Sequence, residues 1–507
     1  MYKKELPRVS PEMVGIPSSR LLRLAEELDH ATEMHGFMIA RNGKVAAEAW
    51  WAPYSEGMPH ICHSLGKSYV GTAIGLACTE GIMSVDDRIV DLFADEIKQY
   101  GVVPNDNMNE LRVRHLLTMS NGMARHPALD ENLVRNYLTE PIVYKPGSRF
   151  MYNTAGTSML CAIIKKVTGM EIRDYMTDKL FRYIGIETDK LRWLKYKSGL
   201  DASPGIASTT ENNLRLGMLY LQRGKWEETQ YISESWIHDA TTRRIDNSLP
   251  GADAEYSAGY GYQIWLCTVP DAFRFDGGHG QFVVVSPRHG IVISINQSGM
   301  MPSGTNRVLE IVNKFLNELD GLPCVILPEN YAENEKLKTY LNSRRIAAAT
   351  VAALPDDPSV FDGIYRITEG EFHIYPELRA NDRDNLDRAF YSIENEYART
   401  LSIQYKGYNI IEILIDHLTR LIVRLDGVME LVPSIGAIPT YDLTCSTGFF
   451  DGSGTLVIHT RWIHTCLCST ITLRLYPNEL VIDVMKSTLH ESSTEIHYFA
   501  RAKRCIV

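Results

Sequence analysis

The pattern of apolar and polar residues over about residues 10–320 predicts helices and strands in alternation. Residues 18–34 carry Leu and Ala at helical spacing after a Pro-Ser-Ser start, which predicts a helix. Residues 36–51 are typical of two strands joined by Arg-Asn-Gly-Lys, and Asn-Gly is a strong hairpin signal. The stretch 307–319 predicts a closing helix. Before it, short strands separated by turns predict an antiparallel meander, at 259–266, 273–278, 281–287 and 290–296.

The segment between the hairpin and the meander, 86–225, is mostly helical in pattern. Strands at both ends of this region join most simply in one antiparallel sheet flanked by helices, with a helical subdomain inserted. We therefore expect an α/β (α+β) fold for residues 1–325. A functional site is expected in the cleft between the sheet and the helical subdomain.

The remainder of the chain has a different pattern. Residues 326–358 form a polar helical stretch that ends at Pro355-Asp356-Asp357-Pro358, and we expect a helical linker there. From 359 to 507 the pattern is one of short strands with turns between them, which predicts an all-β sandwich or barrel. The expected strands lie at 361–367, 399–407, 409–415, 420–427, 454–462, 469–477 and 479–487.

Composition narrows the class of protein. The 507 residues are 45% hydrophobic and 22% charged, the balance of an ordinary globular protein. The net charge of −10 gives no basic surface for nucleic acid or for an anionic membrane. The N-terminal residues lack the apolar core of a signal peptide, and no run reaches the roughly 18 apolar residues of a membrane span. We therefore expect a cytoplasmic protein with no nucleic-acid or membrane partner.

Nine cysteines are scattered along the chain without zinc-knuckle or Cys-x-x-Cys spacing. Cys466 and Cys468 lie near His459 and His464 and suggest a metal cluster at first sight. Their i, i+2 spacing places both thiols on one face of a strand, which buried free cysteines explain at least as well. We expect no metal and no other cofactor.

Ser64 and Lys67 are the strongest candidates for chemistry. They stand at i and i+3 in residues 63–81, a stretch that predicts a helix, so both side chains share a face. A desolvated lysine loses its proton more readily and can activate a neighbouring serine. Chance occurrence of so short a motif is the plain alternative. A phosphate-binding loop ending at Gly66-Lys67-Ser68 is rejected, because position 61 is Ile where that motif needs Gly.

Two further segments can complete such a site. Tyr152 precedes an amphipathic helical pattern within 145–169; a phenol beside a lysine can act as a base or relay, or the ring can simply pack on the loop. The glycine-rich run around His279, within 275–287, lets the backbone approach a ligand. Main-chain N–H groups at 279–281 are candidates for an oxyanion hole, and a β-bulge or tight turn with a solvated histidine is the alternative.

The order Ser-x-x-Lys, then a loop tyrosine, then a glycine-rich strand resembles the serine β-lactamase and penicillin-binding-protein superfamily. The resemblance is closest to the class C branch and its esterase, peptidase and amide-hydrolase relatives, and it covers about residues 10–320. It implies a β-lactamase-like serine hydrolase domain for 1–325. The segments that carry it, in family order, are 64–93, 111–123, 145–169, 205–226 and 259–265.

The resemblance implies that Ser64 is the acylated nucleophile, Lys67 its base and Tyr152 the catalytic tyrosine. It also implies substrate contacts from residues after the tyrosine and from the glycine-rich strand, namely Asn153, Thr154, His279, Gly280 and Gln281. Many relatives read Tyr-x-Asn, whereas this chain has Thr154 at the Asn position, with Asn153 one place early. The Lys-Thr-Gly triplet of penicillin-recognising enzymes is replaced by Gly277-Gly278-His279-Gly280-Gln281.

These departures rank antibiotic hydrolysis below hydrolysis of another small ester, amide or peptide. A β-lactamase, a D-alanyl carboxypeptidase or D-aminopeptidase, an acyltransferase using the same acyl-enzyme, and a non-catalytic binding module remain alternatives. The partner we expect is a small-molecule substrate, with a homo-oligomer possible. In relatives with an appended β domain, that domain resembles a lipocalin-like or barrel module that shapes the cleft or an oligomer interface.

Overall fold

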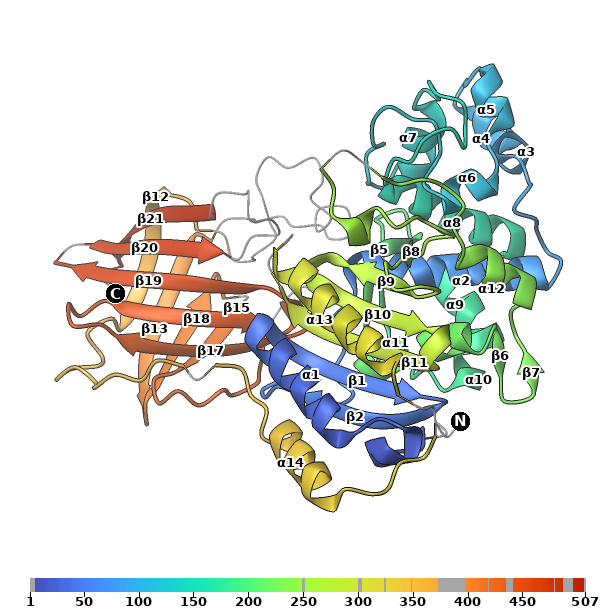
Figure 1. Ribbon diagram of the computed structural model, residues 1–507. Coiled ribbons are helices and arrows are strands. Elements are labelled where there is room, and N and C mark those ends of the chain that lie inside the picture. The colour runs from blue at the N-terminus through green and yellow to red at the C-terminus, as the bar shows by residue number, and fades with distance from the viewer. Residues whose placement is uncertain are drawn as a thin grey trace. The chain divides into compact units, whose positions relative to one another are not determined.

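The computed structural model divides the chain into two compact units, each considered by itself (Figure 1). The first contains Met1–Ala49, Glu56–Gly299 and Gly304–Ser343, and the second contains Trp50–Ser55, Met300–Ser303 and Arg344–Val507. The structure describes residues 5–248, 251–299, 303–322, 325–347, 349–372, 398–417, 419–434, 441–477, 479–486 and 496–505.

The first unit is built on a six-stranded sheet with the order β2-β1-β11-β10-β9-β8. The hairpin predicted from Asn-Gly is present, with Asn42 (φ 50°) and Gly43 (φ 80°) both in the left-handed region. The predicted meander is also present, and the pairings from β1 through β11, β10 and β9 to β8 are antiparallel. The strands are β1 (Glu33–Arg41), β2 (Lys44–Trp50), β8 (Trp265–Leu266), β9 (Phe273–Gly277), β10 (Gln281–Ser286) and β11 (Ile291–Ser298).

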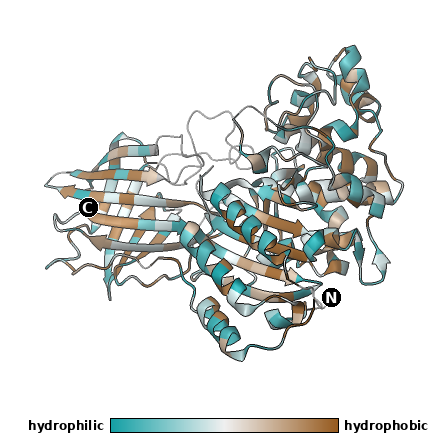
Figure 2. Ribbon diagram, viewed as in Figure 1, coloured by the Kyte–Doolittle hydropathy of each residue, from teal (hydrophilic) through white to brown (hydrophobic). Residues whose placement is uncertain are grey.

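Helices cover both faces of this sheet, whose strands are mostly hydrophobic (Figure 2). Helices α1 (Ser18–Ala31) and α13 (Ser303–Leu319) lie side by side on one face. They are joined by ion pairs of Arg20 with Glu318 and of Lys314 with Glu27. On the other face, α11 (Thr210–Leu221) lies against β10 and β11. A Cβ at its Gly217 would come within 2.7 Å of valine methyl groups, so the close packing requires glycine there.

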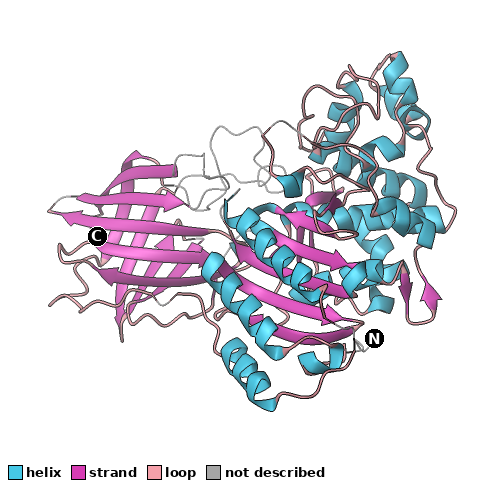
Figure 3. Ribbon diagram, in the orientation of Figure 1, coloured by secondary structure: helices cyan, strands magenta, loops and turns pink. Residues whose placement is uncertain are grey.

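The helical subdomain is inserted between the hairpin and α11, as predicted (Figure 3). Its central helix, α2 (Gly66–Thr79), is buried along nearly its whole length. A three-stranded sheet of β3 (His60–Ile61), β5 (Asp201–Ser208) and β4 (Arg192–Lys195) lies beside it. The other helices are α3 (Ile89–Leu92), α4 (Ala94–Gln99), α5 (Asp106–Glu110), α6 (Val113–Leu117), α7 (Leu133–Thr139), α8 (Thr154–Thr168), α9 (Ile172–Met176) and α10 (Arg182–Ile184). After α11 follow β6 (Lys225–Trp226), β7 (Thr229–Gln230) and α12 (Glu234–Ala240).

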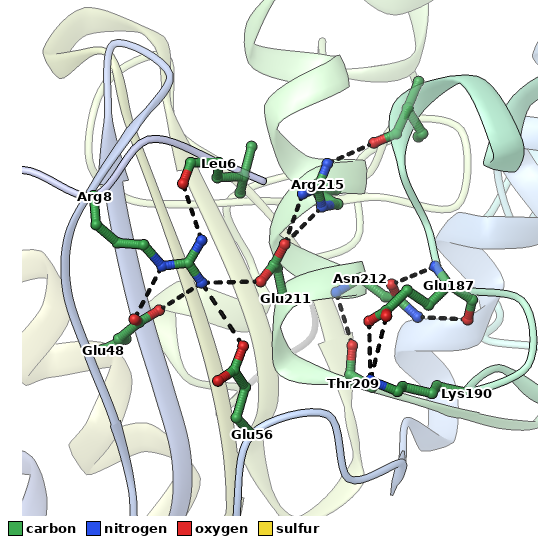
Figure 4. A network of polar contacts seen from close by, with 11 residues as sticks. Leu6, Arg8, Glu48, Glu56, Glu187, Lys190, Thr209, Glu211, Asn212 and Arg215 are labelled. Atoms are coloured by element: carbon green, nitrogen blue, oxygen red, sulfur yellow. Dashed lines mark hydrogen bonds and ion pairs between the residues drawn. The ribbon is translucent and has the colours of Figure 1, made fainter. Parts of the chain in front are cut away.

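A buried ionic network fixes α11 to the N-terminal segment and to the edge of the sheet (Figure 4). Arg215 and Glu211 form a buried pair at 2.7 Å. Glu211 also accepts from Arg8, whose guanidinium in addition contacts Glu48 on β2. Because each buried charge has an opposite partner, the desolvation cost of the group is offset by direct hydrogen bonds.

Gln263 connects three helices of the first unit, α2, α6 and α8. Its carbonyl accepts from Ser68 Oγ at 2.9 Å, and its amide nitrogen donates to the carbonyls of Leu116 and Leu117. Its amide oxygen accepts from Thr157 Oγ1 at 2.8 Å. Gln263 is buried and has φ 60°, so the surrounding hydrogen bonds hold a backbone conformation that a glutamine seldom adopts.

The predicted linker divides between the two units. Its helix, α14 (Tyr331–Asn342), packs on α1 within the first unit, where Tyr340 donates to Asp29 at 2.9 Å. The last segment of the second unit begins at Arg344. Among the described helices, none is long and apolar enough to cross a bilayer.

The second unit is a closed β-barrel, which decides between the sandwich and the barrel predicted from sequence. Nine strands close the ring in the order β15-β14-β13-β12-β21-β20-β19-β18-β17, through a parallel pairing of β15 with β17. The described apolar residues of its strands, among them Tyr365, Ile403 and Leu473, form one core cluster. The strands are β12 (Gly363–Gly370), β13 (Thr400–Gly407), β14 (Ile410–Ile415), β15 (Thr419–Arg424), β16 (Val432–Pro433), β17 (Leu443–Phe450), β18 (Leu456–Trp462), β19 (Cys468–Tyr476), β20 (Glu479–Lys486) and β21 (Ile496–Arg504).

We predict that Gln263→Ala destabilises the first unit by about 2–4 kcal/mol, because it leaves buried partners on several elements unpaired. The midpoint of urea unfolding measures this change. Gln99→Ala at the exposed end of α4 serves as the control and should change stability by less than about 0.5 kcal/mol. Equal effects of the two substitutions would contradict the role assigned to Gln263.

Candidate active site

Ser64 lies in a short 3-10 helix, η2 (His63–Leu65), immediately before α2. The sequence had predicted one continuous helix from residue 63. Ser64 is half-buried, so its hydroxyl is accessible in part. Lys67, in the first turn of α2, donates from Nζ to Ser64 Oγ at 2.8 Å. The predicted pair of side chains is therefore in direct contact.

Lys67 is buried, with 1% of its surface exposed. Burial lowers the pKa of its ammonium from 10.5 to about 7, and the negative charge of Asp276 partly opposes that shift. About half of the Lys67 side chains are therefore neutral near pH 7. A neutral amine in hydrogen-bond contact with a serine hydroxyl is suited to removing its proton.

Tyr152 lies in the turn before α8, as predicted, and its ring is 4.8 Å from Lys67 Nζ. Burial raises the pKa of the Tyr152 phenol, while its hydrogen bond with Ser64 acts in the opposite direction. The phenol therefore keeps its proton at neutral pH and is suited to relay a proton rather than to act as an anionic base. Trp265 stacks on the ring, with centroids 5.7 Å apart, and fixes its orientation.

The glycine-rich end of β9 lies directly against the turn that carries Ser64. A Cβ on Gly277 would lie 2.1 Å from the Cys62 carbonyl oxygen and 3.1 Å from the Leu65 nitrogen. Gly278 is the next residue, and a Cβ there would be 3.6 Å from the His63 ring. The glycines therefore allow the backbone of β9 to reach the nucleophile, which is the arrangement an oxyanion hole requires.

Asn153 and Thr154 are the candidate residues that follow the tyrosine. Asn153 is fully buried and caps α8, its Oδ1 accepting from the Gly156 N–H at 3.1 Å. Its amide nitrogen faces the Met123 sulfur at 3.6 Å. Thr154 is the first residue of α8 and is half-buried at the same end of the helix. The Asn153 side chain is thus engaged in the helix cap.

His279 and Gly280 lie in the turn between β9 and β10, and Gln281 is the first residue of β10. His279 has φ 60° and is 1% exposed, and its Nδ1 is 3.1 Å from the Gly299 carbonyl. The Gly280 carbonyl accepts from Gln297 at 2.9 Å. Gln281 is fully buried and donates to the Gln297 carbonyl at 2.7 Å. These bonds fasten the turn to β11 and hold the glycines of β9 in position.

The structure adds charged and aromatic residues that the sequence reasoning missed. Arg274 and Asp276 form an ion pair at 2.7 Å on β9, and their i, i+2 spacing on a predicted strand was the available signal. Arg274 lies over the rings of Tyr256 and Trp265, at 4.8 and 5.7 Å from their centroids. His63 is also close by; burial and the charges of its neighbours lower its pKa to about 3, so it is neutral at pH 7.

The chain is similar to known proteins of one family. The Beta-lactamase family profile matches residues 23–312. The 6-aminohexanoate-dimer hydrolase of Paenarthrobacter ureafaciens is 21% identical over 295 residues, covering 54% of this chain and 75% of that protein. A penicillin-binding-protein homologue from Caulobacter crescentus is 15% identical, with a TM-score of 0.49, covering 62% of this chain and all of its own. An octameric penicillin-binding-protein homologue from Pyrococcus abyssi is 13% identical, with a TM-score of 0.46, covering 95% and 99%.

We predict that Lys67→Met stabilises the protein, because it removes a group that is costly to bury. The pKa of Lys67 is lowered on folding, so the unfolded chain binds the extra proton between about pH 7 and the unfolded value of 10.5. Over that range, the free-energy cost of burying Lys67 declines as the pH rises. The gain in unfolding free energy should be about 5 kcal/mol near pH 6 and about 2 kcal/mol near pH 9, as measured by urea unfolding.

The control for this measurement is Lys98→Met at an exposed position of α4, which should leave stability nearly unchanged at both pH values. Destabilisation by Lys67→Met, or a gain that does not vary with pH, would contradict the depressed pKa of Lys67.

Proposed function

The chain belongs to the Beta-lactamase family of hydrolases, and we propose that it is a serine hydrolase that forms an acyl-enzyme at Ser64. The observation that carries this proposal is the 2.8 Å hydrogen bond between Lys67 Nζ and Ser64 Oγ, made by a lysine that burial holds near neutrality. A nucleophile in contact with its own base is the signature of covalent catalysis.

In the first half of the proposed reaction, neutral Lys67 accepts the Ser64 hydroxyl proton while Oγ attacks the carbonyl carbon of the substrate. The carbonyl oxygen becomes an oxyanion, and the backbone N–H of Ser64 together with an N–H of the glycine-rich end of β9 stabilises it. As the intermediate collapses, the Tyr152 phenol donates its proton to the leaving oxygen or nitrogen and regains one from protonated Lys67. The bond to the leaving group breaks, and the acyl group stays on Ser64.

In the second half, water attacks the Ser64 ester and gives its proton to the Tyr152–Lys67 pair, which returns it to Ser64 Oγ. The products are an acid and the released alcohol or amine. An alcohol or amine in place of water would give acyl transfer by the same steps.

The proposed substrates are small esters, amides or peptides other than β-lactams. The family's β-lactam-recognising lysine is absent from the glycine-rich strand, where this chain has Asp276 followed by Gly277 and Gly278. The relative from Paenarthrobacter ureafaciens is named for hydrolysis of the 6-aminohexanoate dimer, which supports including small linear substrates. Thr154 offers one hydroxyl in place of the amide many relatives have, and this also favours a different substrate contact.

We predict Ser64-dependent turnover of p-nitrophenyl esters, and we would assay a chromogenic cephalosporin and D- and L-amino-acid anilides beside them. kcat/KM for the ester should rise with pH through a midpoint near 7, because only neutral Lys67 can accept the Ser64 proton. Ser64→Ala should abolish turnover. Tyr152→Phe should lower it by about 10²–10⁴-fold, as expected for loss of a proton relay.

Lys67→Arg is the matched test of the base, because it keeps a cation that does not deprotonate near neutral pH. It should remove the pH-dependent rise together with most of the rate. If no substrate is turned over and an acylating probe adds no mass at Ser64, the proposal is wrong and a binding module becomes the better interpretation. Turnover of the cephalosporin above the ester would favour a β-lactamase instead.

A further inference from the structure

The carboxylate of Asp276 lies at the edge of the candidate active site and has no role in the mechanism above. It immediately precedes Gly277, whose backbone contacts the turn that holds Ser64. Its side chain is 10% exposed, whereas the Arg274 side chain paired with it is 0% exposed. The negative member of the pair is thus slightly exposed, whereas the positive member is fully enclosed in the protein.

Arg274 and Tyr256 hold the Asp276 carboxylate in place. Arg274 Nε donates to Asp276 Oδ2 at 2.7 Å, and the Tyr256 hydroxyl also hydrogen-bonds to this carboxylate. Burial raises the pKa of the Asp276 carboxyl, while the guanidinium in direct contact opposes that shift and favours the ionised form. Arg274 is fixed in turn by the Tyr256 and Trp265 rings and by hydrogen bonds to the Leu266 carbonyl and to Glu255.

The ionic group formed by Arg274, Asp276 and Glu255 contains more negative than positive side chains. Arg274 contributes one positive charge, and Asp276 and Glu255 contribute one negative charge each. His63 is neutral at pH 7, and the reactive form of Lys67 is neutral as well. The field of Asp276 reaches both members of the proton relay, because it raises the pKa of Lys67 and that of Tyr152. A charged substrate group bound beside them experiences the same field.

We propose that Asp276 is a specificity-determining residue that selects against acyl donors with a carboxylate close to the scissile carbonyl and favours those with a cationic group there. This inference rests on the proposed serine hydrolase activity and names the substrate class for it. Charge repulsion across a partly desolvated site disfavours the anionic donor, and attraction favours the cationic one. Asp276 acts here through its charge and takes no proton in the reaction.

The test compares p-nitrophenyl esters of one chain length that end in a carboxylate, a methyl group or a trimethylammonium group. The wild-type protein should show the highest kcat/KM for the cationic ester and the lowest for the anionic ester. Asp276→Asn should reduce the ratio of cationic to anionic kcat/KM by about tenfold, the size expected for loss of one nearby charge in a partly buried site. Background hydrolysis is taken from the Ser64→Ala protein.

Asp271→Asn is the matched control, because it removes the same charge from an exposed turn just before β9. Asp271 has φ 61°, a conformation that Asn adopts readily, so the control should fold normally and keep the wild-type ratio. Asp276→Glu retains the charge and should keep most of the discrimination. If Asp276→Asn fails to fold, Glu255→Gln provides the second test and should reduce the ratio in the same direction by a smaller factor.

The outcomes separate the two proposals. Turnover of the methyl-terminated ester with an unchanged charge ratio in Asp276→Asn, or in Glu255→Gln if the first variant does not fold, would overturn the role of Asp276 alone. A wild-type preference for the anionic ester would overturn it as well. Absence of Ser64-dependent turnover of all three esters by the wild-type protein would overturn the serine hydrolase proposal and this inference with it.

Discussion

The candidate site depends on the removal of Lys67 from water. An ammonium group at the surface keeps its proton at neutral pH and cannot serve as a base, so the chemistry requires a helix that is buried on every side. Helix α2 meets this requirement with small residues. A Cβ at Gly75 would lie 2.2 Å from Trp236 Nε1, and one at Gly71 would lie 3.1 Å from the Gln263 side chain. The glycines lower the intrinsic stability of the helix, but they allow neighbouring elements to enclose it.

Enclosure of the lysine creates a second requirement, which concerns the charges nearby. A buried amine without any negative charge in reach would lose its proton too readily and would be a weaker base. Asp276 opposes the effect of burial on Lys67, and Arg274 prevents that carboxylate from becoming an unpaired buried charge. The Tyr256 and Trp265 rings then cover the guanidinium. In the proposed site, the ion pair and the two aromatic rings therefore belong to the environment that surrounds the buried Lys67.

Local sequence patterns predicted those elements whose structure is determined by residues within the element itself. The Asn-Gly turn defined the β1–β2 hairpin, and the spacing of Ser64 and Lys67 defined their shared face. Strands β3 to β7 of the first unit and β16, β17 and β21 of the second were missed. Between Leu443 and Phe449 the sequence of β17 is TCSTG, which is small and polar, so no alternation of large apolar residues marks it as a strand although most of its residues are buried. For the site, the sequence singled out Ser64, Lys67 and Tyr152 and missed the cap formed by Asn153 and the charge pair on β9, although both contacts are local, at i, i+3 and i, i+2. The enclosure of Arg274 by Tyr256 and Trp265 involves residues from other segments, and no local pattern predicts it.

The glycines of β9 connect this packing to the chemistry. An oxyanion hole requires backbone donors close to the nucleophile, and a side chain on Gly277 would occupy the position of the Cys62 carbonyl. The strand must therefore contact η2 through glycine residues that have no side chain. Any side chain of β9 that influences the site must belong to a residue next to these glycines. Asp276 is the residue immediately before them. Under the proposed mechanism, a substitution at Asp276 changes the charge beside the site while the bare backbone at Gly277 and Gly278 stays in place.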